Sequence, residues 1–162
     1  MPGSITWGNL IPRVLVHAEF RDRATSTRFL VLNTHLDPFS RRSRERAARR
    51  IRHVVAREGL PAVVTGDLNA RPGSTTVREL LAGGTLVDAW AVARERRSPE
   101  WATFADYRFP RENGGRIDWI AVSPNVDVSR VAVNAGRVDG AWASDHLPVQ
   151  AVVRVTPDGD AA

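Results

Sequence analysis

Residues 62–74 read AVVTGDLNARPGS, and this stretch decides how the rest of the chain is interpreted. Its short, β-branched start is typical of a buried strand. Gly66 ends the apolar run, and Asp67 and Asn69 follow one residue apart. Asp and Asn side chains also bond their own backbone in turns, so the pair alone favours a turn and a polar site about equally. The remaining sequence has to decide between them.

The composition indicates one globular unit that covers residues 1–162. Hydrophobic residues make up 43% of the chain and charged residues 25%, which disfavours disorder. Cysteine is absent, which excludes disulfides and thiolate metal sites, so any metal must be held by oxygen or imidazole. No apolar run is long enough for a membrane span, and the first ten residues do not resemble a signal peptide. We therefore expect a cytoplasmic protein without a membrane span.

All 23 basic residues are arginine, and the net charge is +5. Arginine makes forked contacts with phosphate, so a basic surface favours an anionic partner. Residues 40–59 carry eight of these arginines on a pattern that predicts a helix stopped by Gly59 and Pro61. Two interpretations remain open for them: a solvated helix face, or a patch that binds phosphate.

Strand and helix patterns alternate along the chain, which predicts an α/β layered fold. The expected elements are strands at 13–22, 28–35, 62–66, 116–123, 126–134 and 149–156, helices at 40–59 and 74–84, a loop leading into a second helix within 85–97, and a long surface loop at 98–115.

Polar residues cluster where the predicted strands meet loops, which is where ligand sites gather in α/β sheets. The clusters are Asn33 to His35 with Asp37, Asp67 with Asn69, Asp118, and Asp145 with His146. Asp118 lies in the apolar run RIDWIAV, where a buried carboxylate is costly unless it is paired. Its natural partner is a histidine.

Carboxylates, an amide and imidazoles together suit a hard divalent cation and a phosphate. A histidine paired with a carboxylate stabilises an anion or transfers a proton. This set is the equipment of metal-assisted phosphoester hydrolysis. Neither a nucleophile-elbow serine nor a glycine-rich phosphate loop is present to support acyl or nucleotide chemistry.

Four motifs in this order resemble the endonuclease/exonuclease/phosphatase superfamily: VLNTHLD, VVTGDLNARPGS, GRIDWIAVS and ASDHLPVQAVV. The group includes pancreatic-type deoxyribonucleases and inositol-phosphate phosphatases. The resemblance covers about residues 2–155. It implies a layered β-sandwich flanked by helices, like that of deoxyribonuclease I, and a phosphoesterase that uses Mg²⁺ or Mn²⁺.

The resemblance also implies roles for the first three site residues. His35 would contact the scissile phosphate or the leaving group. Asp67 would orient or deprotonate the attacking water and help to bind the cation. Asn69 would hold a phosphate oxygen, with Gly66 allowing a tight turn that aims both side chains at one phosphate. Asn33 and Asp37 match less well, and packing or turn roles explain them equally.

The other three implied site residues lie in the last third of the chain. Asp118 would buttress His146, and Asp145 would bind the cation directly or through water. His146 would stabilise the transition state or serve as the base. The choice of base between Asp67 and His146 stays open.

One departure from the family is expected to matter. Family members carry a stretch of roughly equal length before the region seen here, with an Asn and a metal-binding Glu. We therefore expect a partial domain that lacks the N-terminal part of the fold, with an exposed inward sheet face that favours aggregation or pairing. Either that stretch is missing or a partner chain supplies it. The alternative to an enzyme, whose activity would be impaired, is a catalytically silent fragment that binds phosphate or nucleic acid.

The substrate is the least determined property. Candidates are a phosphorylated small molecule, a lipid head group and a nucleic acid. The loops at 98–115 and 135–144 are expected to border the cleft. Their aromatic residues either stack on a substrate or pack the rim: Trp101, Phe104, Tyr107 and Trp142.

Overall fold

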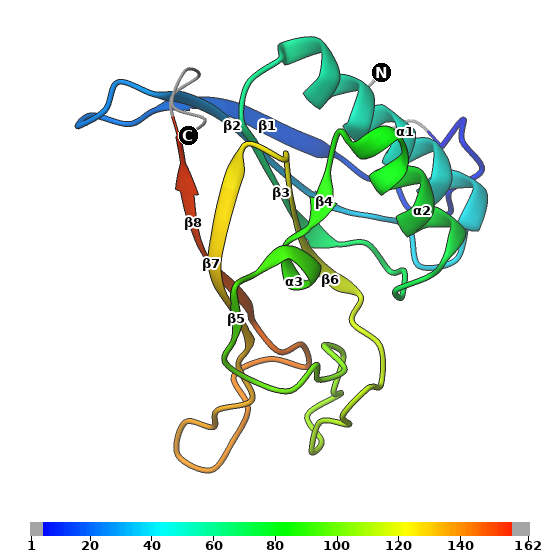
Figure 1. Cartoon of the computed structure of the whole chain (residues 1–162). Helices are drawn as coiled ribbons and strands as arrows, with labels where there is room; N and C mark the ends of the chain where they lie inside the picture. The colour runs from blue at the N-terminus through cyan, green and yellow to red at the C-terminus, as the bar shows by residue number, and fades with distance from the viewer. Residues whose placement is uncertain (1–4, 157–162) are drawn as a thin grey trace.

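Two β-sheets and a pair of helices form the molecule, as a computed structural model of residues 5–156 describes it (Figure 1). The first sheet has the order β1-β2-β3-β6-β4. Its strands are β1 (Leu15–Arg21), β2 (Arg28–His35), β3 (Ala62–Asp67), β6 (Asp118–Val122) and β4 (Val87–Asp88). The second sheet has the order β5-β7-β8. Its strands are β5 (Glu95–Arg96), β7 (Val126–Val133) and β8 (Val149–Val155). The mixed α/β layering predicted from the sequence is confirmed.

Two helices, α1 (Arg41–Glu58) and α2 (Thr75–Leu81), cover one face of the first sheet (Figure 1). Ser40 caps α1 by accepting a hydrogen bond from the Ser43 amide, and Gly59 ends it in the left-handed conformation. Its buried residues include Ile51, Val54 and Val55, which pack with Leu32 and Val64 of the sheet. No helix among residues 5–156 combines the length and the apolar character that crossing a bilayer requires.

The strand register determines which side chains lie on the opposite face of the first sheet. Asn33 pairs with Thr65, and Thr65 with Ile120, while Val31 pairs with Val63. Because paired residues point to the same side, these side chains share the face that does not touch the helices. The second sheet covers part of this face, with β8 lying against β6.

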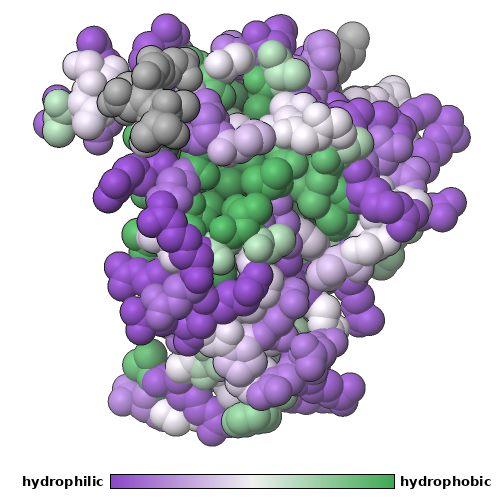
Figure 2. Space-filling model, viewed as in Figure 1, coloured by the Kyte–Doolittle hydropathy of each residue, from purple (hydrophilic) through white to green (hydrophobic). Residues whose placement is uncertain are grey.

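The remaining part of that face is apolar and open. Val16 and Phe20 of β1 are 61% and 50% exposed, and Val63 and Ile120 are only half-buried. Figure 2 shows a continuous apolar area in the middle of the viewed side. The exposed sheet face expected from the sequence is therefore present, and β8 forms an edge of the second sheet beside it.

The expected helix within residues 85–97 is wrong in extent. Strand β4, a single turn α3 (Ala89–Val92) and strand β5 replace it, and a 3₁₀ turn covers Ala82–Gly84. Asp88 caps α3 through the Trp90 amide, but Ala93 already leaves the helix with an extended ψ of 136°. The chain then runs beside β7, where the amides of Arg94 and Arg97 donate to the carbonyls of Val128 and Val131. Sheet pairing overrides the local helical propensity here.

Candidate active site

Three predicted site residues meet at one end of the first sheet because of its register. His35 pairs with Asp67, and Asp67 pairs with Asp118, so β2, β3 and β6 each end or begin there on the same face. The Nε2 atom of His35 lies 3.3 Å from Oδ2 of Asp67. The strand ends therefore place an imidazole and two carboxylates side by side.

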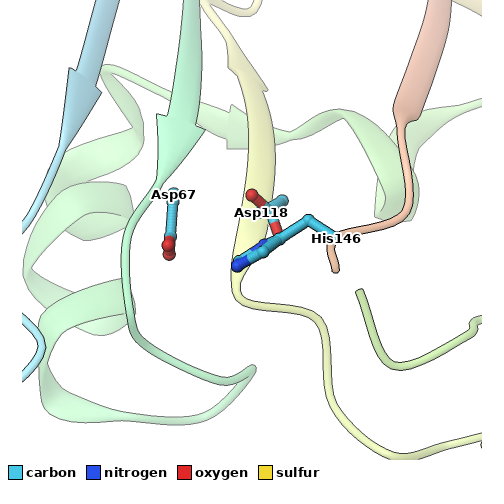
Figure 3. A group of neighbouring side chains, drawn as sticks. All are labelled: Asp67, Asp118 and His146. Atoms are coloured by element: carbon cyan, nitrogen blue, oxygen red, sulfur yellow. The ribbon is translucent and has the colours of Figure 1, made fainter. Parts of the chain in front are cut away.

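His146 reaches the same point from the loop that precedes β8 (Figure 3). Its Nδ1 atom lies 2.8 Å from Oδ2 of Asp118, so the predicted carboxylate–histidine pair exists. The aromatic ring of Phe104 lies against the imidazole, with ring centroids 5.1 Å apart. Both members of the pair are partly shielded from water, which strengthens their interaction.

The protonation of the site follows from these contacts. Burial raises the pKa of Asp67 above its ordinary value, and the nearby charge of Asp118 adds to that rise. Burial opposes protonation of His146, but its hydrogen bond to Asp118 and the negative charges around it outweigh burial and raise the pKa of His146. The site therefore holds an imidazole that favours its charged form beside a carboxylate that is harder to ionise.

One residue that the sequence did not single out ties these parts together. Thr103 is fully buried, and its hydroxyl accepts hydrogen bonds from the amides of Ile117 and Asp118 at 2.9 and 3.1 Å. Its carbonyl accepts a third bond from the Leu147 amide at 2.7 Å. Thr103 therefore joins the strand that carries Asp118 to the loop that carries His146. A lone threonine inside a long irregular loop gives no sequence signal of this role.

A second anchor lies beside Asp118. The Arg116 guanidinium is 2% exposed and bonds Asp88 Oδ2 at 2.6 Å and Glu100 Oε1 at 2.8 Å. It also lies over the ring of Trp119, 4.1 Å from the centroid. Because Asp88 belongs to β4 and Glu100 to the long loop, Arg116 fixes that loop against the first sheet.

Asn69 is held by the protein around it. Its backbone, at φ 47°, donates to Oδ1 of Asp67 at 2.7 Å, and its side-chain amide donates to the Leu36 carbonyl at 3.0 Å. The amide also lies 3.4 Å from Oδ2 of Asp67. Asn69 therefore orients the Asp67 carboxylate, and the phosphate contact that the family resemblance implies for its amide stays a prediction.

Gly66 has a structural role other than the predicted turn. It lies within β3 at φ 147°, and a Cβ atom there would come within 1.9 Å of the Thr34 carbonyl oxygen on β2. The glycine is required because the two strands approach closely where they carry His35 and Asp67.

The remaining predicted residues lie at the margin. Asp145 accepts a hydrogen bond from the Ser144 hydroxyl, and its carbonyl anchors the amides of Ala105 and Asp106. The Asn33 side chain accepts from the Thr65 hydroxyl. Asp37 is 1% exposed and accepts four backbone amides, those of Leu10, Ile11, Phe39 and Ser40, so its role is structural.

The predicted aromatic residues divide into two groups. Trp101 and Trp142 both contact Phe109 edge to face, so these residues pack the rim. Phe104 and Tyr107 are 50% and 61% exposed, and Phe104 is the one that touches His146.

The donor set fits a divalent cation. Asp67, Asp118 and His146 each offer a ligand atom, and these atoms lie within 4.8 Å of one another. The two carboxylates suit Mg²⁺ or Mn²⁺ when water or phosphate oxygens complete the coordination, whereas an imidazole binds such a cation only in its neutral form. An open pocket of about 340 Å³ adjoins them, so a phosphorylated group has access.

Several solved structures are similar to this chain. An endonuclease/exonuclease/phosphatase family protein from Bacteroides thetaiotaomicron shares 26% identity at a TM-score of 0.86, over 93% of this chain and 58% of its own. A mannosyl-6-phosphatase from the same species shares 26% at 0.85, over 93% and 60%. A family protein from Bacteroides vulgatus shares 30% at 0.82, over 93% and 58%. This chain thus spans about three-fifths of their length.

Among curated protein sequences none matches this chain. The profile of the endonuclease/exonuclease/phosphatase family matches residues 5–146, which include every predicted site residue. With the shared fold and the strand-end arrangement of these residues, this match assigns the chain to the endonuclease/exonuclease/phosphatase family, whose members generally hydrolyse phosphoester bonds.

Proposed function

We propose that this chain hydrolyses phosphomonoesters or phosphodiesters with a water molecule, in the presence of Mg²⁺ or Mn²⁺. The observation that carries the proposal is the convergence of Asp67, Asp118 and His146 from three separate segments, with ligand atoms within 4.8 Å. Asp67 and Asp145 are the proposed cation ligands, Asp145 acting directly or through water. The bound cation would offset negative charge on the phosphoryl oxygens.

His146 is the proposed stabiliser of the transition state. Because Asp118 raises the pKa of His146, the imidazole favours the charged form that attracts a phosphoryl oxygen. Asp118 would act through His146, holding the ring by the 2.8 Å contact to Nδ1 and leaving Nε2 for the substrate.

Asp67 is the proposed base that orients and deprotonates the attacking water. Its raised pKa brings it closer to neutral pH than an exposed aspartate, which favours general-base catalysis. Asn69 fixes one carboxylate oxygen through its amide. His35, exposed at the mouth of the site, is proposed to contact the phosphate or the leaving group.

Hydrolysis of p-nitrophenyl phosphate and bis(p-nitrophenyl) phosphate with Mg²⁺ tests the proposal. Asp67→Asn and His146→Ala are each expected to lower kcat by about 10²-fold or more, which is the usual contribution of such groups. EDTA should abolish turnover. Asp127→Asn on β7 and His53→Ala on the outer side of α1 are matched controls that should retain it. Absence of turnover by the unaltered chain at millimolar Mg²⁺ or Mn²⁺ would refute the proposal.

The monoester and the diester also distinguish between the substrate classes that the sequence left open. Preference for the monoester points to a phosphorylated small molecule, and preference for the diester to a nucleic acid or lipid head group. The phosphatase among the similar structures makes the monoester the first choice.

A further inference from the structure

The outer side of α1 carries charge that the candidate site does not use. Five of its eight guanidinium groups are engaged within the protein. Arg41, Arg49 and Arg57 pair with Glu45, Glu79 and Glu58, and Arg44 and Arg52 donate to backbone carbonyls. The other three make neither a hydrogen bond nor an ion pair with any residue from 5 to 156: Arg42, Arg46 and Arg50.

These three residues form a line, here named the arginine stripe. Positions four apart lie on the same side of a helix, so Arg42, Arg46 and Arg50 are neighbours along α1. The helical rise separates the first from the last by about 12 Å. Arg42 and Arg50 are exposed, and Arg46 is half-exposed.

A cavity of about 220 Å³ continues the arginine stripe at Arg50, between α1, β2 and the segment that precedes β1. Arg13 also lines it, and the Arg13 Nε atom is buried without a hydrogen-bond partner in the described part of the chain. Asp37 is the acidic residue of its lining, but four backbone amides already occupy that carboxylate. The cavity therefore offers two guanidinium groups to an anion.

We infer that the arginine stripe and this cavity bind the phosphate backbone of a nucleic-acid strand. Neighbouring arginines of the stripe are about 6 Å apart along the helix, a spacing comparable to that of successive phosphates in an extended single strand, so the three positions match three phosphates. Arg42 and Arg46 would contact successive phosphates, and Arg50 with Arg13 would hold one at the cavity. Guanidinium groups form two parallel hydrogen bonds to a phosphate, which suits this arrangement.

The packing of α1 favours a nucleic acid over a lipid surface. Helices that lie in a membrane interface bury an apolar side in the acyl region. The apolar side of α1 is buried in the core instead, with Ile51, Val54 and Val55 at most 3% exposed. The outer side therefore offers mainly charged groups and no large apolar side chain. This binding needs neither a metal ion nor hydrolysis and goes beyond the proposed activity.

Fluorescence anisotropy with a labelled 20-nucleotide oligo(dT), in EDTA, tests the inference. Binding should weaken with salt, with a slope of log K against log[salt] of about −2 for three phosphate contacts. The triple variant R42Q/R46Q/R50Q should bind at least tenfold more weakly at 50 mM salt and lose most of the slope. Arg13→Gln alone should weaken binding about threefold.

The matched control is R41Q/R49Q/R57Q, which removes the same charge from the same helix. It should bind within threefold of the unaltered chain, because those groups already have partners. Circular dichroism checks that all variants fold. Equal loss in both triple variants, no binding by the unaltered chain, or stripe-dependent binding to vesicles with 30% phosphatidylserine but not to oligo(dT) would each overturn the inference. Unchanged binding by Arg13→Gln would overturn the part played by the cavity.

Discussion

Gly66 of β3 and Thr34 of β2 approach so closely that a Cβ atom at position 66 would lie 1.9 Å from the Thr34 carbonyl oxygen. The contact occurs one residue before His35 and Asp67, which form a register pair at the sheet end. The spacing between His35 and Asp67 therefore depends on the lack of a Cβ atom at position 66. Backbone has to move if any other residue replaces it.

Gly66→Ala is expected to lower the free energy of unfolding by about 3 kcal/mol, because the new methyl group displaces backbone and not a flexible side chain. Urea denaturation followed by circular dichroism measures this. Gly73→Ala is the control, since Gly73 also has a positive φ, 77°, but faces open space. That variant should lose only about 1 kcal/mol from the left-handed conformation. Equal losses at the two positions would contradict the close-contact explanation.

Asp37 should stabilise the fold more at neutral than at acid pH. Burial opposes its ionisation, but four backbone amides outweigh burial and lower the pKa of Asp37. A lowered pKa means that stability is present above the ordinary value near 4 and is lost as the pH falls. Asp37→Asn should cost about 2 kcal/mol at pH 7, because hydrogen bonds to a charged acceptor are lost.

Urea denaturation of both proteins between pH 7 and pH 3 checks this dependence. The difference in unfolding free energy between the unaltered chain and Asp37→Asn should shrink toward pH 3. The exposed Asp139→Asn is the control and should show no such trend. A constant difference across the range would rule out a charged Asp37 as the stabilising group.

The contribution of His146 to folding stability should change with pH in the opposite direction to that of Asp37. Its pKa is raised above the ordinary 6.5 despite burial, through the hydrogen bond to Asp118 and the surrounding charges. A raised pKa contributes stability that is fully present below pH 6.5 and is lost as the pH rises through the folded-state value. Asp118→Asn removes the main favourable partner. It should lower the His146 pKa, as NMR titration of the imidazole in EDTA measures, and an unchanged value would contradict the pairing.

Much of this site was predictable because its polar residues lie in or directly after apolar runs that are recognisable as strands. An Asp inside the apolar run RIDWIAV predicted a histidine partner, and the structure pairs Asp118 with His146. The strands that end at His35 and Asp67 were predicted from their apolar patterns, and their register brings the two residues together. The local sequence pattern indicated which polar residues stand at strand ends, and the pairing of the strands determines where these residues meet.

The rest depended on contacts between distant segments. Gly66 was predicted to serve a turn, but its role depends on the backbone of β2, which sequence spacing does not reveal. The backbone role of Asp145 was not predicted either, because its carbonyl accepts from the amides of Ala105 and Asp106 in the distant long loop, while its role as a cation ligand stays a proposal. The helix expected at 85–97 became two short strands and a single turn, because β6 and β7 offer pairing partners there.

The hydroxyl of Thr103 should affect both the stability of the fold and the position of Asp118 relative to His146. Thr103→Val keeps the shape but cannot accept the hydrogen bonds of the Ile117 and Asp118 amides, which leaves two partly buried donors unpaired. We expect a loss of about 2 kcal/mol of unfolding free energy. We also expect kcat to fall by at least tenfold with little change in KM, because Asp118 and His146 move relative to each other. Thr103→Ser restores the acceptor and should recover most of kcat. If the Val and Ser variants lose kcat equally, the hydroxyl acceptor is not what holds the pair.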